Sequence, residues 1–231
     1  MTEMTALIRM RLIAYLRTQV AFAPLLAALV VLGIFYGGGQ ANPTEAYGMS
    51  AVVLFPVLAW QVKILLDVEP DVQRRIAATA IGSRAKEVVA GLVAAALTAA
   101  PTILAGMVLP WLVGGITMRK SPVALEAAVL SGLWAHVIAV PGALALGALA
   151  SRAISRTAGN GVAILVTGFV FAIVLGLKES PAPWLVPPLM PVSRAVIPGA
   201  SPAQVAALSV WAIAWAAAVL FGYTRLRRTR P

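Results

Sequence analysis

The feature that most restricts the fold is a series of long apolar runs separated by short polar segments. Hydrophobic residues make up 61% of the 231 residues and charged residues only 11%, whereas charged residues form about a quarter of an ordinary soluble domain. A helix of about 20 apolar residues is long enough to cross the hydrocarbon core of a bilayer. The sequence therefore predicts an all-α integral membrane protein, with residues 1–231 forming a single transmembrane domain.

Six apolar runs are predicted as transmembrane helices. The first run has 17 residues, which is longer than the hydrophobic region of a usual signal peptide, so we expect a span and not a cleaved leader. The six predicted spans are 20–36, 47–66, 88–113, 123–150, 160–177 and 205–223.

The segment 4–18, before the first span, combines apolar side chains with Arg9, Arg11 and Arg17 at helical spacing. This pattern is typical of a helix that lies in the plane of the membrane interface, with its basic side chains among the lipid headgroups. We therefore expect residues 4–18 to form an interfacial helix that contacts membrane lipid.

A polar interruption separates the second span from the third, and its centre predicts a short amphipathic helix over residues 70–80. Pro70 and Asp71 suit a first helical turn, where a missing N–H costs little and a negative charge meets the positive end of the helix. Val72 and Ile76 are four residues apart and therefore share one face. The sequence places this small charged helix at the boundary between membrane and water.

Lys and Arg are distributed unequally between the two predicted sides of the membrane. Thirteen of the eighteen lie in segments 4–18, 67–87, 151–157 and 224–230, and only four lie in the loops of the other side. Because basic residues accumulate on the cytoplasmic side, both termini and the 70–80 helix are predicted to be cytoplasmic. We expect a multi-pass protein of the cytoplasmic (inner) membrane, whose net charge of +10 serves topology and lipid contact instead of nucleic-acid binding.

Residues 178–204, before the last span, contain seven of the sixteen prolines. This density argues against a regular helix. Because many of the remaining residues are apolar, we expect an external segment that folds back onto the membrane surface or partly into it.

Few polar side chains fall within the spans, and three of them are candidates for a transport pathway: Gln61, Lys63 and His136. Lys63 stands four residues before Asp67, so the two side chains can meet on one helix face. For Lys63 we favour a side chain that reaches the interface over a transport role. For His136 we favour a hydrogen-bonded packing residue over a proton relay.

The sequence lacks the motifs of the common catalytic sites. It has no Gly-rich phosphate-binding loop ending in Gly-Lys-Ser/Thr, one histidine and no cysteine. We therefore expect a chain that is not an enzyme, binds no metal and holds no cofactor of its own.

The order of these parts resembles the membrane subunit of small bacterial ABC exporters of the ABC-2 type. The parts are an N-terminal amphipathic helix, two spans, a cytoplasmic amphipathic helix, four more spans, and a folded external segment before the last span. The most similar stretch runs from Glu69 to Gly91, where a short helix is followed by the turn Gly82-Ser83-Arg84 and a basic start to the third span.

The resemblance implies that the 70–80 helix is a coupling helix that inserts into a groove of a separate cytoplasmic P-loop ATPase. Two permease copies and two ATPases would assemble, with ATP and Mg²⁺ bound and hydrolysed on the partner chain. The substrate would leave between the two permeases. The coupling residues expected on this basis are Asp71, Val72, Arg74, Arg75, Ile76 and Arg84. The apolar spans themselves favour a hydrophobic or amphipathic substrate (a drug, antibiotic, peptide or lipid).

In the same interpretation, the segment 178–204 forms an external gate that closes against its counterpart in a second copy of the chain. The expected sealing side chains are Trp184, Leu185, Leu189 and Met190. The alternative for this segment is a lid packed on its own chain.

Other function classes stay open as alternatives, namely a secondary transporter and a membrane assembly protein without an ATPase partner. A secondary transporter is expected to show internal repeats and a polar site at the midplane of the membrane. The sequence shows neither a clear repeat nor a charged pair at that depth.

Overall fold

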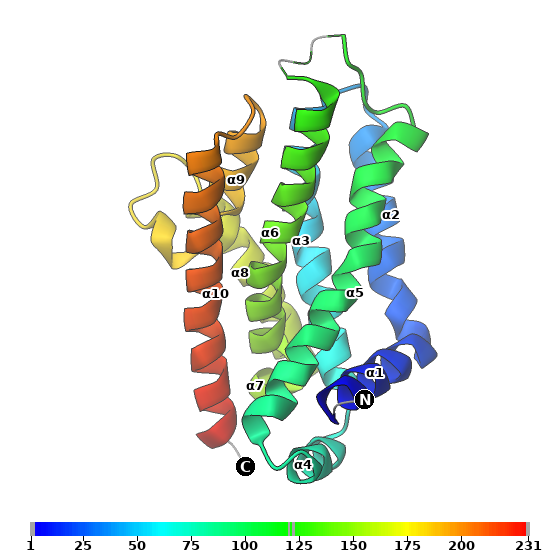
Figure 1. Ribbon diagram of the computed structural model, residues 1–231, viewed down its shortest axis with the longest axis vertical. Coiled ribbons are helices and arrows are strands. Elements are labelled where there is room, and N and C mark those ends of the chain that lie inside the picture. Colours follow the sequence, from blue (N-terminus) through cyan, green and yellow to red (C-terminus); the bar gives the residue numbers. More distant parts are fainter. Residues whose placement is uncertain (1–2, 120, 122, 230–231) are drawn as a thin grey trace.

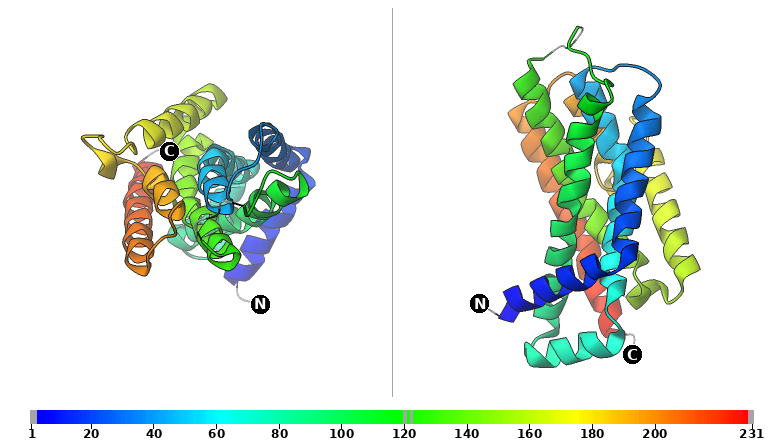
Figure 2. Two further views of the ribbon diagram at one scale, coloured as in Figure 1. Left: turned by 90° about the horizontal axis from the view of Figure 1, so that it is seen from above. Right: turned by 90° about the vertical axis from the view of Figure 1, so that its right-hand side faces the viewer.

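The computed structural model describes residues 3–119, 121 and 123–229, and within these residues the chain is helical without any strand. The long helices run side by side, while α1 and α4 lie across one end of the bundle (Figures 1 and 2). The elements are α1 Glu3–Arg17, η1 Gln19–Ala21, α2 Phe22–Tyr36, α3 Pro43–Val68, α4 Asp71–Ala80, α5 Arg84–Leu112, α6 Leu125–Ala150, α7 Arg152–Ser155, α8 Ala158–Val174, η2 Pro183–Leu185, α9 Leu189–Val196 and α10 Pro202–Thr229.

Five helical stretches of the described chain are long and apolar enough to cross a membrane: Gln19–Tyr36, Pro43–Val68, Arg84–Leu112, Leu125–Ser155 and Pro202–Arg227. They correspond to five of the six predicted spans, so the chain is an all-α protein suited to multiple membrane passes. At the remaining predicted span, the structure has α8, an apolar helix of 17 residues that ends at Val174. A sixth crossing therefore stays a prediction.

Local start signals explain why two observed helices start earlier than the predicted spans 47–66 and 88–113. Pro43 opens α3 in its first turn, where its missing N–H costs nothing. Ser83 caps α5, since its hydroxyl oxygen accepts a hydrogen bond from the backbone N–H of Lys86 at 3.3 Å. The proline start of α3 and the serine cap of α5 extend both helices beyond their apolar cores.

The third helix, α3, is the centre of the bundle and packs against α2, α5, α6, α8 and α9. Glycines let its neighbours approach closely. A Cβ atom on Gly147 of α6 would lie 2.5 Å from the backbone oxygen of Ala59, and one on Gly132 would lie 2.5 Å from the Tyr47 ring. In a bilayer, where lipid is as apolar as the helices, such close contact supplies much of the association free energy.

The N-terminal helix α1 differs from the prediction in one respect. It forms as expected, and Arg9 and Arg17 are exposed, but Arg11 is buried together with Leu7 and Tyr15. These three residues are spaced four apart and therefore form one helix face. Arg11 thus points into the protein and does not reach the lipid headgroups.

The expectation that residues 178–204 contain no regular helix is wrong for α9, Leu189–Val196. Pro191 lies in the first turn of α9, where a backbone N–H has no intrahelical partner, so the proline does not interrupt the helix. Val192 and Val196 of α9 are buried against α3 and α6.

Three single cysteines in this cysteine-free chain test the topology. The two ends of the described chain lie at the same end of the bundle (Figure 1), as an even number of crossings requires. With six spans, Gln40→Cys and Glu179→Cys react with a membrane-impermeant maleimide added to intact cells. Gln73→Cys on α4 reacts only after permeabilisation. All three positions are exposed in the bundle, so each reports the side that it faces.

Failure of Glu179→Cys to react from outside, with Gln40→Cys reactive, would show that α8 does not cross. Reaction of Gln73→Cys in intact cells would contradict the predicted orientation.

Candidate functional site

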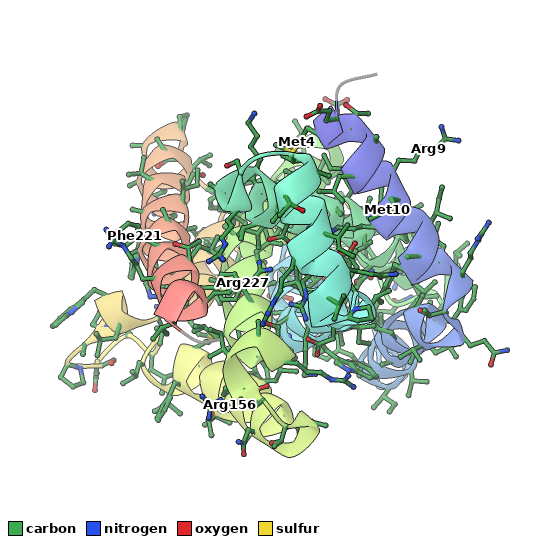
Figure 3. All side chains as sticks on the ribbon, turned by 90° about the horizontal axis from the view of Figure 1, so that it is seen from below. Met4, Arg9, Met10, Arg156, Phe221 and Arg227 are labelled. Carbon is green, nitrogen blue, oxygen red and sulfur yellow. The ribbon has the colours of Figure 1, made fainter. Side chains whose placement is uncertain are left out.

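The end of the bundle that carries α1, α4 and the last turns of α10 gathers most of the arginines; we call it the basic end. Figure 3 looks at this end, with α4 lying over the ends of the long helices and Arg227 between α10 and α4. The chain enters α4 from Pro70 and leaves it through Gly82, whose φ of 69° is one that glycine adopts without strain. The short connections on both sides hold α4 across the ends of α3 and α5.

The outward side of α4 carries two exposed apolar side chains among polar ones. Val72 and Ile76 are 67% and 62% exposed, and Arg75 is also exposed. Arg74, by contrast, is only 7% exposed and turns toward the bundle. Of the other expected coupling residues, Arg84 is exposed at the start of α5, while the side chain of Asp71 lies outside the described part of the structure.

A buried ionic network lies behind α4. The guanidinium of Arg11 donates from Nε to Glu69 Oε2 at 2.8 Å, from Nη2 to Glu87 Oε1 at 2.5 Å, and from Nη1 to the backbone oxygen of Glu87 at 2.8 Å. The other oxygen of the Glu87 carboxylate, Oε2, pairs with Nη2 of Arg227 at 2.9 Å. The network, Arg11–Glu69–Glu87–Arg227, joins α1, the residue after α3, α5 and α10.

This network was not predicted from the sequence, because Arg11 was expected to contact lipid headgroups. The one available signal was the position of Arg11 on the helix. It stands four residues after Leu7 and four before Tyr15, on the apolar side of α1. This position predicts a buried side chain, and a buried arginine requires carboxylate partners.

The pair Lys63–Asp67 is confirmed, with Lys63 Nζ at 2.7 Å from Asp67 Oδ2. The second oxygen of the carboxylate accepts a hydrogen bond from the backbone N–H of Arg152 at 2.7 Å. Asp67 therefore joins α3 to α7, and Lys63 neutralises it.

Gln61 connects α3 with α5. Its amide nitrogen donates to the backbone oxygen of Thr98 at 2.5 Å, and its amide oxygen accepts from the Thr102 hydroxyl at 2.9 Å. Burial raises the pKa of Tyr15 on α1 above its usual value, and the nearby Gln61 side chain lowers that pKa by a smaller amount. These contacts make Gln61 part of the packing between helices.

His136 is wholly buried between α6 and α3. Its Nδ1 lies 2.8 Å from the backbone oxygen of Gly132, and its Nε2 lies 3.1 Å from the Ser50 hydroxyl. Because a carbonyl oxygen can only accept, Nδ1 carries the proton and Nε2 accepts from Ser50. Gln61, Lys63 and His136 therefore have separate partners and do not meet in one polar site.

The expected gate residues fall into two groups. Trp184 and Leu185 of η2 are exposed, whereas Leu189 is buried in the core of its own chain and Met190 packs against that core. The indole N–H of Trp215 donates to the backbone oxygen of Leu185 at 2.9 Å and so ties η2 to α10. Of the four expected gate residues, the two in η2 are the ones exposed enough to face a second molecule.

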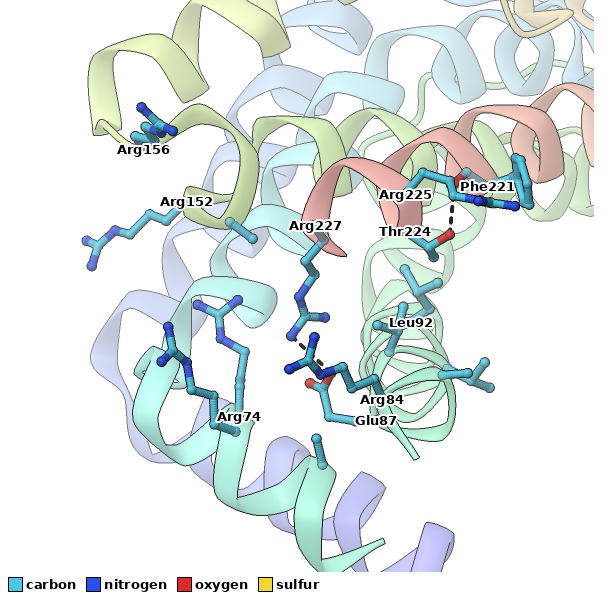
Figure 4. Close-up of a pocket in the computed structure, with 16 residues that line it drawn as sticks. Arg74, Arg84, Glu87, Leu92, Arg152, Arg156, Phe221, Thr224, Arg225 and Arg227 are labelled. Carbon is cyan, nitrogen blue, oxygen red and sulfur yellow. Dashed lines mark hydrogen bonds and ion pairs between the residues drawn. The ribbon is translucent and has the colours of Figure 1, made fainter. Parts of the chain in front are cut away.

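The basic end also contains a cavity of about 870 Å³, which the sequence did not reveal. We call it the arginine cavity. It lies between α4, α5, α7 and α10 (Figure 4) and has both charged and apolar walls. Its arginines are Arg74, Arg75, Arg84, Arg152, Arg156, Arg225 and Arg227, and its apolar residues include Val88, Val89, Leu92 and Phe221.

Replacement of Arg11 by Met tests the network. The change leaves the carboxylate of Glu69 buried and without its partner, and breaking a buried ion pair in this way costs about 3–5 kcal/mol. We expect Arg11→Met to lower the melting temperature of the purified protein markedly. The control is Arg9→Met, which removes an exposed charge from the same helix. Equal melting temperatures for the two variants would show that the network does not stabilise the fold.

Within the described residues, no three His, Asp or Glu side chains lie close enough together to hold a metal ion. Comparisons with protein-family models, curated proteins and solved structures find no match for this chain. Its function therefore has to be inferred from its own geometry.

Proposed function

We propose that the chain is the permease subunit of an ATP-driven exporter of the ABC-2 type, in which α4 docks a separate cytoplasmic P-loop ATPase. The observation that carries this proposal is the outward face of α4. Val72 and Ile76 are exposed there at the basic end, which the charge distribution predicts to face the cytoplasm. Exposed apolar side chains favour a partner that removes them from water, and a groove in an ATPase would cover them.

The connections of α4 favour a coupling role over simple lipid contact. One residue, Pro70, separates α4 from Glu69, and three separate it from α5, where Glu87 lies in the first turn. Both carboxylates bind Arg11, and Glu87 also binds Arg227. A displacement of α4 by a partner would therefore be transmitted to α1, α3, α5 and α10 together, as rigid-body transitions require.

The polar residues of the spans favour an exporter over a secondary transporter. A secondary transporter uses polar or charged groups at the midplane to bind its substrate and coupling ion. In this chain Gln61 and His136 are engaged by neighbouring helices, and Lys63 is paired with Asp67 on its own helix. We therefore assign substrate passage to the surface between two copies of the chain, with a hydrophobic or amphipathic substrate, and ATP hydrolysis to the partner.

Substitutions on the outward face of α4 test this proposal. We expect Arg75→Glu combined with Ile76→Asp to abolish co-purification of the P-loop ATPase with the tagged chain and the ATPase activity of the eluate. Arg74 is left unchanged, because it is buried and its reversal would disturb the fold itself. The matched control is Arg9→Glu, an exposed reversal at the same end.

The double variant should elute as a folded protein with the melting temperature of the unaltered chain. An unchanged yield of ATPase with this variant, or no ATPase with the unaltered chain, would contradict the proposal.

The external gate of this exporter is assigned to η2, because Trp184 and Leu185 are its exposed apolar side chains. We expect Leu185→Cys to form a disulfide between two copies in the resting complex and to block transport until it is reduced. Val210→Cys, an exposed apolar position on α10, controls for random collision in the membrane. If position 185 forms no crosslink, or if transport continues while it is crosslinked, the gate assignment is contradicted. η2 would then be a lid that packs on its own chain.

A further inference from the structure

The arginine cavity carries a large excess of positive charge. Seven arginines and one acidic residue, Glu87, line it, and both oxygens of the Glu87 carboxylate already bind Arg11 and Arg227. Within the described residues, the guanidinium groups of Arg84, Arg152 and Arg156 form no ion pair. Like charges around one cavity repel, so an anion bound between them would stabilise this end of the protein.

The backbone at Arg156 points to the same conclusion. Arg156 has a φ of 63° and is the only non-glycine residue of the described chain with a positive φ. A side chain other than glycine is strained in such a conformation, and residues under this strain cluster at binding sites. The turn after α7 thereby brings Arg156 to the wall of the cavity beside Arg152 (Figure 4).

The apolar residues that line the cavity lie on α5 and α10, and exposed apolar residues continue from them along both helices. Val89 lines the cavity and begins a stripe of exposed residues on α5 that includes Val93 and Leu97, spaced four apart. Phe221 lines the cavity from α10 and begins a second exposed stripe, through Ala217 to Ile213. Both stripes lead from the charged cavity into the depth that the spans assign to the hydrocarbon core.

We propose that the arginine cavity binds the phosphate of an anionic phospholipid from the leaflet at the basic end, with its acyl chains lying along the exposed stripes of α5 and α10. Guanidinium groups match phosphate oxygens in pairs of parallel hydrogen bonds, so several arginines in one cavity select a phosphate. A soluble phosphate would use only the charged wall, whereas a phospholipid uses both walls. The bound headgroup bridges α7 to α4, α5 and α10.

Lipid titration of the purified protein tests this site. The protein in a neutral detergent is titrated with dioleoyl phosphatidylglycerol, dioleoyl phosphatidylcholine or glycerol 3-phosphate, and bound lipid is counted by native mass spectrometry. We expect phosphatidylglycerol to bind most tightly. Arg152→Gln combined with Arg156→Gln should weaken its binding at least about tenfold. Both side chains are exposed and outside α4, so the result does not depend on ATPase docking.

Two further double variants separate a site from general charge attraction. Arg9→Gln with Arg17→Gln removes the same charge from exposed positions on α1 and should leave phosphatidylglycerol binding nearly unchanged. Arg152→Lys with Arg156→Lys keeps the charge and should retain part of the affinity.

Three outcomes would overturn the proposal. The first is equal weakening by the α1 and α7 glutamine variants, and the second is equal affinity for phosphatidylcholine and phosphatidylglycerol. The third is binding of glycerol 3-phosphate as tightly as the lipid, which would identify a site for a soluble phosphate.

Discussion

The structure of the basic end depends on the burial of one guanidinium group. Arg11 is 5% exposed, and a buried charge is tolerated only where opposite charges and hydrogen bonds replace water. Two carboxylates from separate elements, Glu69 and Glu87, meet this need. Their meeting point fixes α1 against α3 and α5, and the contact of Glu87 with Arg227 adds α10. Because α4 lies between Glu69 and Glu87 in the chain, the same network fixes both of its attachments.

The division of arginines at this end follows from the number of carboxylates. Glu69 and Glu87 neutralise Arg11 and Arg227, and Asp67 is neutralised by Lys63. Seven arginines and one acidic residue, Glu87, line the cavity. Positive charge therefore exceeds negative charge around it, and anionic lipids of a membrane leaflet would reduce the repulsion.

The parts of the fold that depend on local sequence were predictable. Long apolar runs located five helices of spanning length, and Pro70 together with the turn at Gly82 located α4. The parts of the fold that depend on partners distant in the sequence were not predictable. Arg11 binds residues 58 and 76 positions away, and no local pattern encodes that pairing. The inward turn of Arg74 and the arginine cavity likewise arise only when α4, α7 and α10 are brought together. The helix α9 was not predicted, because the number of prolines alone argued against a helix. Pro191 lies in the first turn, where a proline does not interrupt a helix.

The fixed basic end also determines where the bundle can bend. Three packed helices contain an interior proline: Pro56 in α3, Pro101 in α5 and Pro141 in α6. Each proline removes one backbone hydrogen bond and allows a kink at that level of the helix. Since the ionic network joins the ends of α3 and α5 near α4, a displacement of α4 would move these two ends as one body. Bending of these helices would then fall at Pro56 and Pro101. Motion at the basic end would reach the opposite end, where α9 and η2 lie, as a change in helix direction and not as a loosening of the network.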